Sequence, residues 1–133
     1  MIQYIGTKLI KAEPQEKDGK AGYKVCYPDG YVSWSPKDVF EEAYRPTDGW
    51  SFGLDIEAAK KGKKIARSGW NGKNQDVELA TNISYVSADG SVVNTEHDAI
   101  GNKALAFVGT SGVQMGWLAS QADMLADDWK IVD

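Results

Sequence analysis

Alternating apolar and polar positions predict a β-hairpin near the start of the chain. Residues 23–27 alternate from side to side, and residues 31–34 repeat the pattern after Pro28-Asp29-Gly30. Pro presets φ and Gly accepts a positive φ, so this tripeptide is typical of a turn. Two shorter strand-like pieces are expected before the hairpin, at residues 4–6 and 8–10, followed by a polar loop over 13–22.

A helix is predicted after the hairpin. Ser35-Pro36 can open it, because Ser caps helices and Pro suits the first helical position. Val39, Phe40 and Ala43 then form an apolar stripe. Residues 1–46 are therefore expected to form a small ββα module. The segment 45–49 is a candidate linker, since Pro discourages continuation of a helix and Asp-Gly favours a turn.

The second part of the chain, residues 50–133, begins with a predicted helix. Ser51 is the expected cap, and Phe52, Ile56 and Ala59 follow at helical spacing. Gly62 is expected to end this helix, because glycine suits the position after the last turn.

Short strands dominate the rest of this second part. The pattern predicts them at 64–67, 77–80, 84–86, 92–93, 104–108, 113–118 and 129–132, with hairpin turns at 88–91 and 109–112. Ser120 begins a second short helix, and Asp123 is placed to answer it across the first turn. The predicted fold class is α+β, a small, mainly antiparallel β-sheet module with two short helices, preceded by the ββα module.

Composition and charge narrow the functional classes. The chain is 42% hydrophobic, with five Trp and six Tyr, which is typical of a folded protein. A net charge of −4 argues against broad DNA or RNA binding, which depends on neutralising many phosphates. The stretch 58–75 is nonetheless basic, with six cationic and no acidic residues, and can attract a small anion. Its cationic residues are Lys60, Lys61, Lys63, Lys64, Arg67 and Lys73.

Localisation is expected to be cytoplasmic. No apolar run reaches the length that spans a bilayer, and residues 1–4 do not begin a signal peptide. The single cysteine, Cys26, permits no internal disulfide and reads as a buried strand thiol.

No catalytic set emerges from the sequence. The one histidine, His97, lies in a polar stretch typical of a surface loop, where adjacent residues cannot all aim at one metal ion. No nucleophile elbow or phosphate-binding loop is present. Asp127-Asp128 precedes a predicted strand and reads as a solvated turn. We therefore expect a binding protein with no catalytic residues, no metal and no cofactor.

The best candidate site is the loop from Arg67 to Lys73. Trp70 lies between glycines and beside Asn71, and an indole that stacks on a nucleobase contributes about 1–3 kcal/mol. Asn71 offers a donor and an acceptor, while Arg67 and Lys73 could hold phosphate. Alternatively, Trp70 fills the core and the glycines only shape a turn. Local sequence leaves both readings open.

The same ambiguity applies to Trp117 and Trp129. Trp129 lies in a predicted terminal strand, which favours the core.

Two long motifs resemble those of a known family. Residues 58–73 (AAKKGKKIARSGWNGK) and 117–129 (WLASQADMLADDW), together with Phe52-Gly53, are similar to the second Thoeris anti-defence family of phage proteins. The resemblance spans about Ser51 to Asp133. Little is matched between the motifs, and an insert near 94–102 bears on pocket shape. The run 27–45 resembles another small module common in phage proteins, for which no chemistry is known.

The resemblance implies a sponge for nucleotide immune signals. Members of the family bind, without cleaving, the cyclised ADP-ribose made by the TIR enzyme of the bacterial Thoeris system. Some also hold cyclic dinucleotides of CBASS defence at separate sites. They assemble as homotetramers with pockets between subunits, and they act in the cytoplasm of the infected bacterial host.

Site residues follow from the matching motifs. Phe52, Trp70 and Trp117 are candidates for stacking, and Arg67 and Lys73 for phosphate contacts. Candidates for polar contacts are Asn71, Ser120, Gln121 and Asp123. Ser120 and Asp123 could instead serve only the helix cap. Two other functions stay open, an enzyme that degrades the same signals and an inhibitor that binds a defence enzyme directly.

Overall fold

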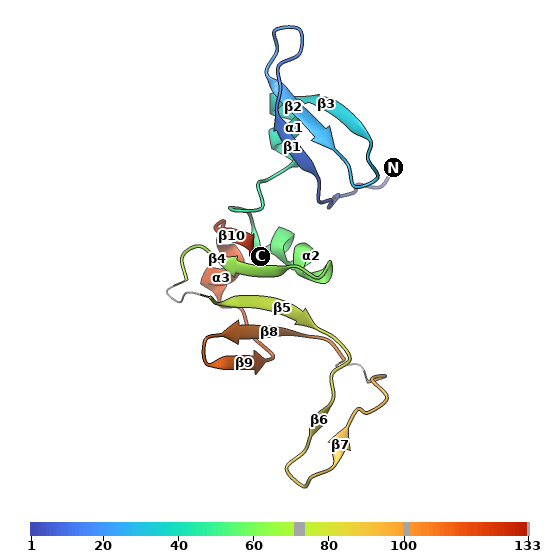
Figure 1. The fold of residues 1–133 in the computed structure, drawn as a ribbon, viewed down its shortest axis with the longest axis vertical. Coiled ribbons are helices and arrows are strands. Elements are labelled where there is room, and N and C mark those ends of the chain that lie inside the picture. The colour runs from blue at the N-terminus through green and yellow to red at the C-terminus, as the bar shows by residue number, and fades with distance from the viewer. Residues whose placement is uncertain (71–73, 100–101, 133) are drawn as a thin grey trace. The chain divides into compact units, whose positions relative to one another are not determined.

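The computed structural model describes residues 1–70, 74–99 and 102–132. The chain divides into two compact units, Met1–Pro46 and Thr47–Asp133 (Figure 1). The α+β class is confirmed, with antiparallel sheets and short helices in both units. Among the described residues, no helix is long and apolar enough to cross a membrane.

Unit 1 is a three-stranded antiparallel sheet with one helix. Its strands, in the order β1-β2-β3, are β1 (Lys11–Pro14), β2 (Gly22–Cys26) and β3 (Val32–Pro36), followed by α1 (Lys37–Ala43). The predicted hairpin and helix are present. The extra strand lies at 11–14, whereas the strand-like pieces expected at 4–6 and 8–10 are not strands. All four residues of β1 are exposed, so they show no apolar alternation from which a strand could be predicted. Strand β1 forms because it pairs with β2.

The core of unit 1 is small. Val25 is its buried hydrophobic residue, and Phe40 of α1 stacks on Tyr23 of β2 with ring centroids 4.2 Å apart. Gly22 is also buried, because the Trp34 ring occupies the space of a side chain there.

Three local expectations for unit 1 are corrected. Cys26 is only half-buried, because it follows Val25 on the alternate face of β2. Val39 and Ala43 are exposed, so Phe40 alone of the expected stripe packs on the sheet. The helix begins after Pro36 without a side-chain cap, since the Ser35 hydroxyl donates to the Pro36 carbonyl.

Unit 2 is built on a five-stranded antiparallel sheet in the order β10-β4-β5-β8-β9 (Figure 1). These strands are β4 (Lys64–Arg67), β5 (Asp76–Ala80), β8 (Ala104–Gly109), β9 (Gly112–Met115) and β10 (Trp129–Val132). Strand β9 ends earlier than predicted. Gly116 turns the chain with a φ of +84°, and the Gly116 and Trp117 amides both donate to the Leu105 carbonyl.

Two short helices accompany this sheet, as predicted. Helix α2 (Phe52–Lys60) is capped by the Ser51 hydroxyl, which accepts from the Leu54 amide at 3.4 Å, and Gly62 follows it with a φ of +89°. Helix α3 (Gln121–Leu125) begins at Ser120. The buried hydrophobic residues of unit 2 are Trp50, Ala58, Ala59, Ile65, Ala66, Val77, Ala106 and Trp129.

Helix α2 also buries a carboxylate that the sequence pattern did not single out. Asp55 is fully buried, and one of its oxygens accepts a hydrogen bond from the Trp50 indole. Its other oxygen, Oδ2, has no hydrogen-bond partner among the described residues. The available signal was its place on the apolar stripe, three residues after Phe52 and four before Ala59.

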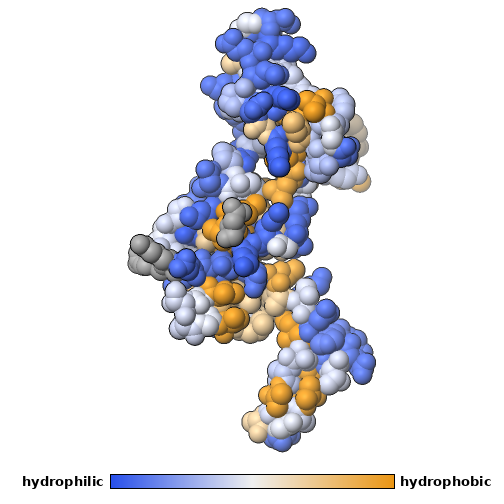
Figure 2. All heavy atoms as spheres, in the orientation of Figure 1, coloured by the Kyte–Doolittle hydropathy of each residue, from blue (hydrophilic) through white to orange (hydrophobic). Residues whose placement is uncertain are grey.

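A separate two-stranded hairpin lies between β5 and β8 in the sequence. It consists of β6 (Tyr85–Val86) and β7 (Val92–Val93), joined by the predicted turn. Ala80 and Ala104 are paired where β5 ends and β8 begins, so the chain leaves and rejoins the main sheet at one place. Apolar side chains reach the surface along the hairpin, including Val86 and Val92 (Figure 2).

Candidate functional site

Five aromatic rings from different parts of unit 2 meet at one place. They are Phe52, Trp70, Phe107, Trp117 and Trp129, here called the aromatic cluster. Trp129 is fully buried, which confirms its predicted core position, whereas the other four rings are half-buried. The cluster therefore has a buried base, and part of the surface of its other rings is accessible.

Trp70 connects the cluster to polar groups. Its ring centroid lies 5.3 Å from that of Trp129, 5.9 Å from Trp117 and 5.7 Å from Phe107. Its indole nitrogen donates to Oδ1 of Asp123 at 3.4 Å. Trp70 is thus anchored among core rings while it stays half-buried, so the two alternatives for this residue are not exclusive.

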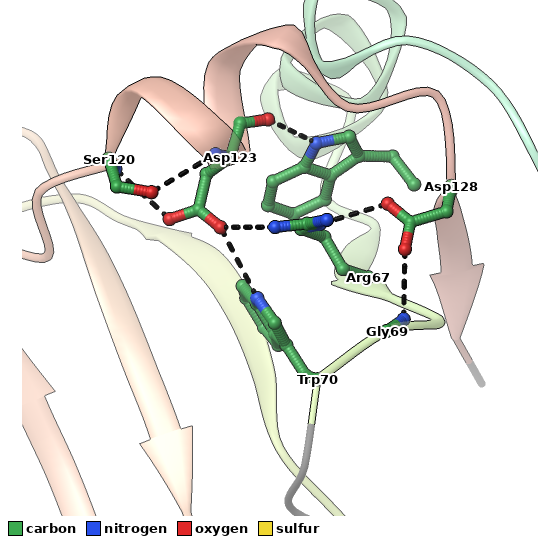
Figure 3. A network of polar contacts seen from close by, with 7 residues as sticks. Arg67, Gly69, Trp70, Ser120, Asp123 and Asp128 are labelled. Atoms are coloured by element: carbon green, nitrogen blue, oxygen red, sulfur yellow. Dashed lines mark hydrogen bonds and ion pairs between the residues drawn. The ribbon is translucent and has the colours of Figure 1, made fainter.

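Arg67, at the end of β4, lies between two carboxylates (Figure 3). Its Nε donates to Oδ1 of Asp128 and its Nη1 to Oδ1 of Asp123, each at 2.9 Å. Asp128 and Asp123 hold the pKa of the guanidinium above its ordinary value. We call these residues, with Gly69, Trp70 and Ser120, the polar network. With its two aspartates and one arginine, it carries more negative than positive charge.

Asp128 was predicted to lie in a solvated turn, and the structure corrects this. Its Oδ2 accepts from the Gly69 amide at 2.9 Å, and its main-chain oxygen accepts from the Ser68 amide at 3.0 Å. The hydrogen bond from Arg67 lowers the pKa of its carboxyl, and partial burial opposes this effect.

Ser120 and Asp123 form the capping box that the sequence predicted. The Ser120 hydroxyl accepts from the Asp123 amide, and Oδ2 of Asp123 accepts from the Ser120 amide, both at 3.0 Å. Burial acts to raise the pKa of Asp123, but hydrogen bonds from the Ser120 backbone, Arg67 and other donors lower it overall. Asp123 serves the helix cap with one oxygen and the polar network with the other.

The remaining candidate residues make none of the contacts of the aromatic cluster or the polar network among the described residues. Gln121 is the first residue of α3 and is exposed. Lys61, Lys63 and Lys64 of the basic segment are exposed, and Lys60 pairs with Glu57 at 3.3 Å. Asn71 and Lys73 lie outside the described residues.

Two members of the site were missed by sequence reasoning. Phe107 lies in a predicted strand whose pattern did not reveal which side chains face the cluster. Asp128 had one usable signal, since the 117–129 motif is acidic and the 58–73 motif basic. Opposite charge in two motifs is a reason to test whether they pair.

Comparison with known proteins identifies this part of the chain. The model of the Thoeris anti-defense 2-like domain matches residues 50–132. A protein of Bacillus phage SP01 described as Thoeris anti-defense 2 is 37% identical over 87 residues, which cover 62% of this chain and 93% of the phage protein. The match includes the aromatic cluster and the polar network. The chain therefore belongs to the Thoeris anti-defense 2-like family.

Proposed function

We propose that this protein sequesters cyclic nucleotide immune signals in the cytoplasm of an infected bacterial host and releases them unchanged. The proposed ligand is a cyclic ADP-ribose isomer of the Thoeris system, with cyclic dinucleotides of CBASS as further candidates. The observation that carries the proposal is the half-buried set Phe52, Trp70 and Trp117 beside the polar network, within the segment that matches an anti-defence family.

Stacking is the proposed source of most of the affinity. Base–aromatic stacking contributes about 1–3 kcal/mol per base. A sponge needs a dissociation constant below the signal concentration that activates the effector, and a nanomolar constant corresponds to about −12 kcal/mol. Two stacks therefore have to be supplemented by phosphate and ribose contacts.

One nitrogen of the Arg67 guanidinium, Nη2, can donate to a phosphate. Its Nε and Nη1 are engaged by aspartates, whereas Nη2 has no hydrogen-bond partner among the described residues. We propose that Nη2 and Lys73 contact phosphate oxygens. Asn71, Ser120, Gln121 and Asp123 are proposed to contact base edges and ribose hydroxyls. The exposed lysines nearby raise the local concentration of an anionic ligand.

The proposed assembly is a homotetramer whose pockets lie between subunits. Support comes from apolar residues exposed near the site and on the sheet edge. Leu118 is 90% exposed, Leu125 78% and Val113 64%. Isolated exposed leucines are ordinary, but an apolar residue exposed on an edge strand, such as Val113 on β9, suits contact with another subunit.

Calorimetry followed by heat release tests the function. Purified protein is titrated with the cyclic ADP-ribose product of a Thoeris TIR enzyme. The complex is then heated, and the released nucleotide is identified by mass spectrometry. Stoichiometric recovery of intact ligand is expected. Turnover at substoichiometric protein would indicate a phosphodiesterase, and a complex with a defence enzyme without nucleotide binding would indicate a direct inhibitor.

A further inference from the structure

We propose that Asp128 is a positioning residue of the ligand site, which acts by fixing the loop Ser68–Trp70 on which the Trp70 ring is carried. The inference rests on the proposed function, because that function supplies the ligand the loop would serve. Figure 3 shows the Asp128 carboxylate between Arg67 and the Gly69 amide, at the start of the segment that leads to Trp70.

Asp128 holds three consecutive residues. Its Oδ1 accepts from Arg67 Nε, its main-chain oxygen from the Ser68 amide and its Oδ2 from the Gly69 amide, at 2.9, 3.0 and 2.9 Å. The Trp70 amide then donates to the Arg67 carbonyl at 3.3 Å. The backbone amides of Ser68, Gly69 and Trp70 are therefore all held by hydrogen bonds.

Glycine at position 69 suits this contact, whereas its own backbone angles do not call for glycine. Its φ is not in the positive range that favours glycine. A Cβ at this position would lie 2.9 Å from Oδ2 of Asp128, which is closer than real side chains approach. Any side chain at position 69 would therefore push the carboxylate away from the amide it accepts from.

A direct ligand contact by Asp128 is the less suitable role. Its negative charge would repel the phosphate proposed for Arg67, and Asp128 is the residue that accepts from both Arg67 and the Gly69 amide. By holding Nε of Arg67, Asp128 also fixes the guanidinium that carries Nη2, the donor proposed for phosphate.

The test compares Asp128→Asn with Asp127→Asn in the full chain. Both remove one negative charge, but Asp127 is exposed and makes no hydrogen bond through its side chain to the described residues. Nitrogen–proton correlation spectra report the Gly69 amide and the Trp70 indole, and calorimetry reports affinity for the cyclic ADP-ribose product. In Asp128→Asn we expect both signals to shift, Gly69 exchange to accelerate and affinity to fall by about tenfold or more. Asp127→Asn should match the wild type.

A second variant keeps the inference testable if Asp128→Asn does not fold. Gly69→Ala leaves both charges in place and disturbs the same contact, so it should shift the Trp70 indole and lower affinity in the same way. Unchanged loop signals, or shifted signals with affinity within about twofold of wild type, would overturn the proposal. If the wild-type protein binds no nucleotide, the proposed function fails, and the spectra still decide whether Asp128 fixes the loop.

Discussion

At the scale of single residues, Trp70 packs against core rings and is also the ring proposed to stack on the ligand. A Trp that packs edge-on against core rings has little freedom, so its exposed surface is preorganised for a ligand. The indole N–H of Trp70 is directed to Asp123, which leaves stacking as the interaction its accessible surface can offer.

Substitution of Trp70 should therefore affect stability and binding together. Trp70→Ala is expected to lower the free energy of unfolding by about 2 kcal/mol, because half-buried ring contacts are lost. It should weaken nucleotide binding by at least about 2 kcal/mol. Trp70→Phe keeps a ring but not the N–H and should lose less of both. Thermal unfolding and calorimetry measure the two effects, and an Ala variant that binds like wild type would assign Trp70 to the core alone.

Asp55 is the second residue with an unusual environment. Burial raises the pKa of its carboxyl to about 7, and the hydrogen bond from Trp50 opposes that rise. The folded protein therefore holds this proton more tightly than the unfolded chain does. The contribution of Asp55 to stability is fully present below pH 4 and is lost as the pH rises towards about 7.

Asp55→Asn should remove this pH dependence. The amide stays neutral and can still accept from Trp50, so the variant should have a higher Tm than wild type at pH 8 and a similar Tm at pH 4. A gain of about 1 kcal/mol corresponds to roughly 4–8 °C in a domain of this size. The measurement is thermal unfolding across this pH range. If the Tm difference between wild type and variant is the same at pH 4 and pH 8, Asp55 is not the source of the pH dependence.

At the scale of elements, most local signals were correct, although the expected Ser35 cap is absent. Caps at Ser51 and Ser120, the glycine after α2 and both hairpin turns were correctly predicted, because each depends on a few neighbouring residues. Strand β1 was not, since its pairing with β2 is independent of its own pattern. The end of β9 was misplaced because Leu105, on the neighbouring strand β8, accepts the hydrogen bonds from Gly116 and Trp117 that turn the chain.

The candidate site was partly predictable for the same reason. The two motifs supplied Arg67, Trp70 and Asp123 as separate candidates. Their meeting, with Nη1 of Arg67 on Asp123, joins residues from both motifs and requires β10 to pair beside β4. The pattern of residues within a single segment cannot predict which strands pair, so it could not predict this contact.

The start of α3 gives a prediction at this scale. Ser120→Ala should lower stability by about 1 kcal/mol, because one backbone donor of the helix loses its acceptor. Ser120→Asn should stay close to wild type, since Asn caps nearly as well. Chemical denaturation measures both variants, and calorimetry shows whether Ser120 also contacts ligand. Equal stability of the Ala and Asn variants would show that the Ser120 cap does not contribute to the stability of the protein.

At the scale of the whole molecule, the edge strand β9 of the main sheet bears on the proposed assembly. Strand β9 is the last strand in the order β10-β4-β5-β8-β9, and all four of its residues are exposed. Proteins usually block such edges with charge, yet Val113 and Met115 are apolar here.

Placing a charge on this edge should disrupt the proposed tetramer. Val113→Lys is expected to shift the mass in solution to smaller species, whereas Val39→Lys makes the same change at an exposed valine of unit 1 and should not. Sedimentation with and without nucleotide measures the assembly. A Val113→Lys variant of wild-type mass would remove β9 from the interface, and a monomeric wild type would contradict the tetramer itself.

The hairpin β6–β7 has a consequence for how such proteins diversify. Because the chain leaves the main sheet at Ala80 and returns at its direct partner Ala104, the intervening segment can change in length while β5 and β8 keep their register. The β5–β8 ladder, which carries Phe107 of the aromatic cluster, would then stay unchanged. Insertions or deletions between Ala80 and Ala104 should therefore be tolerated by the main sheet.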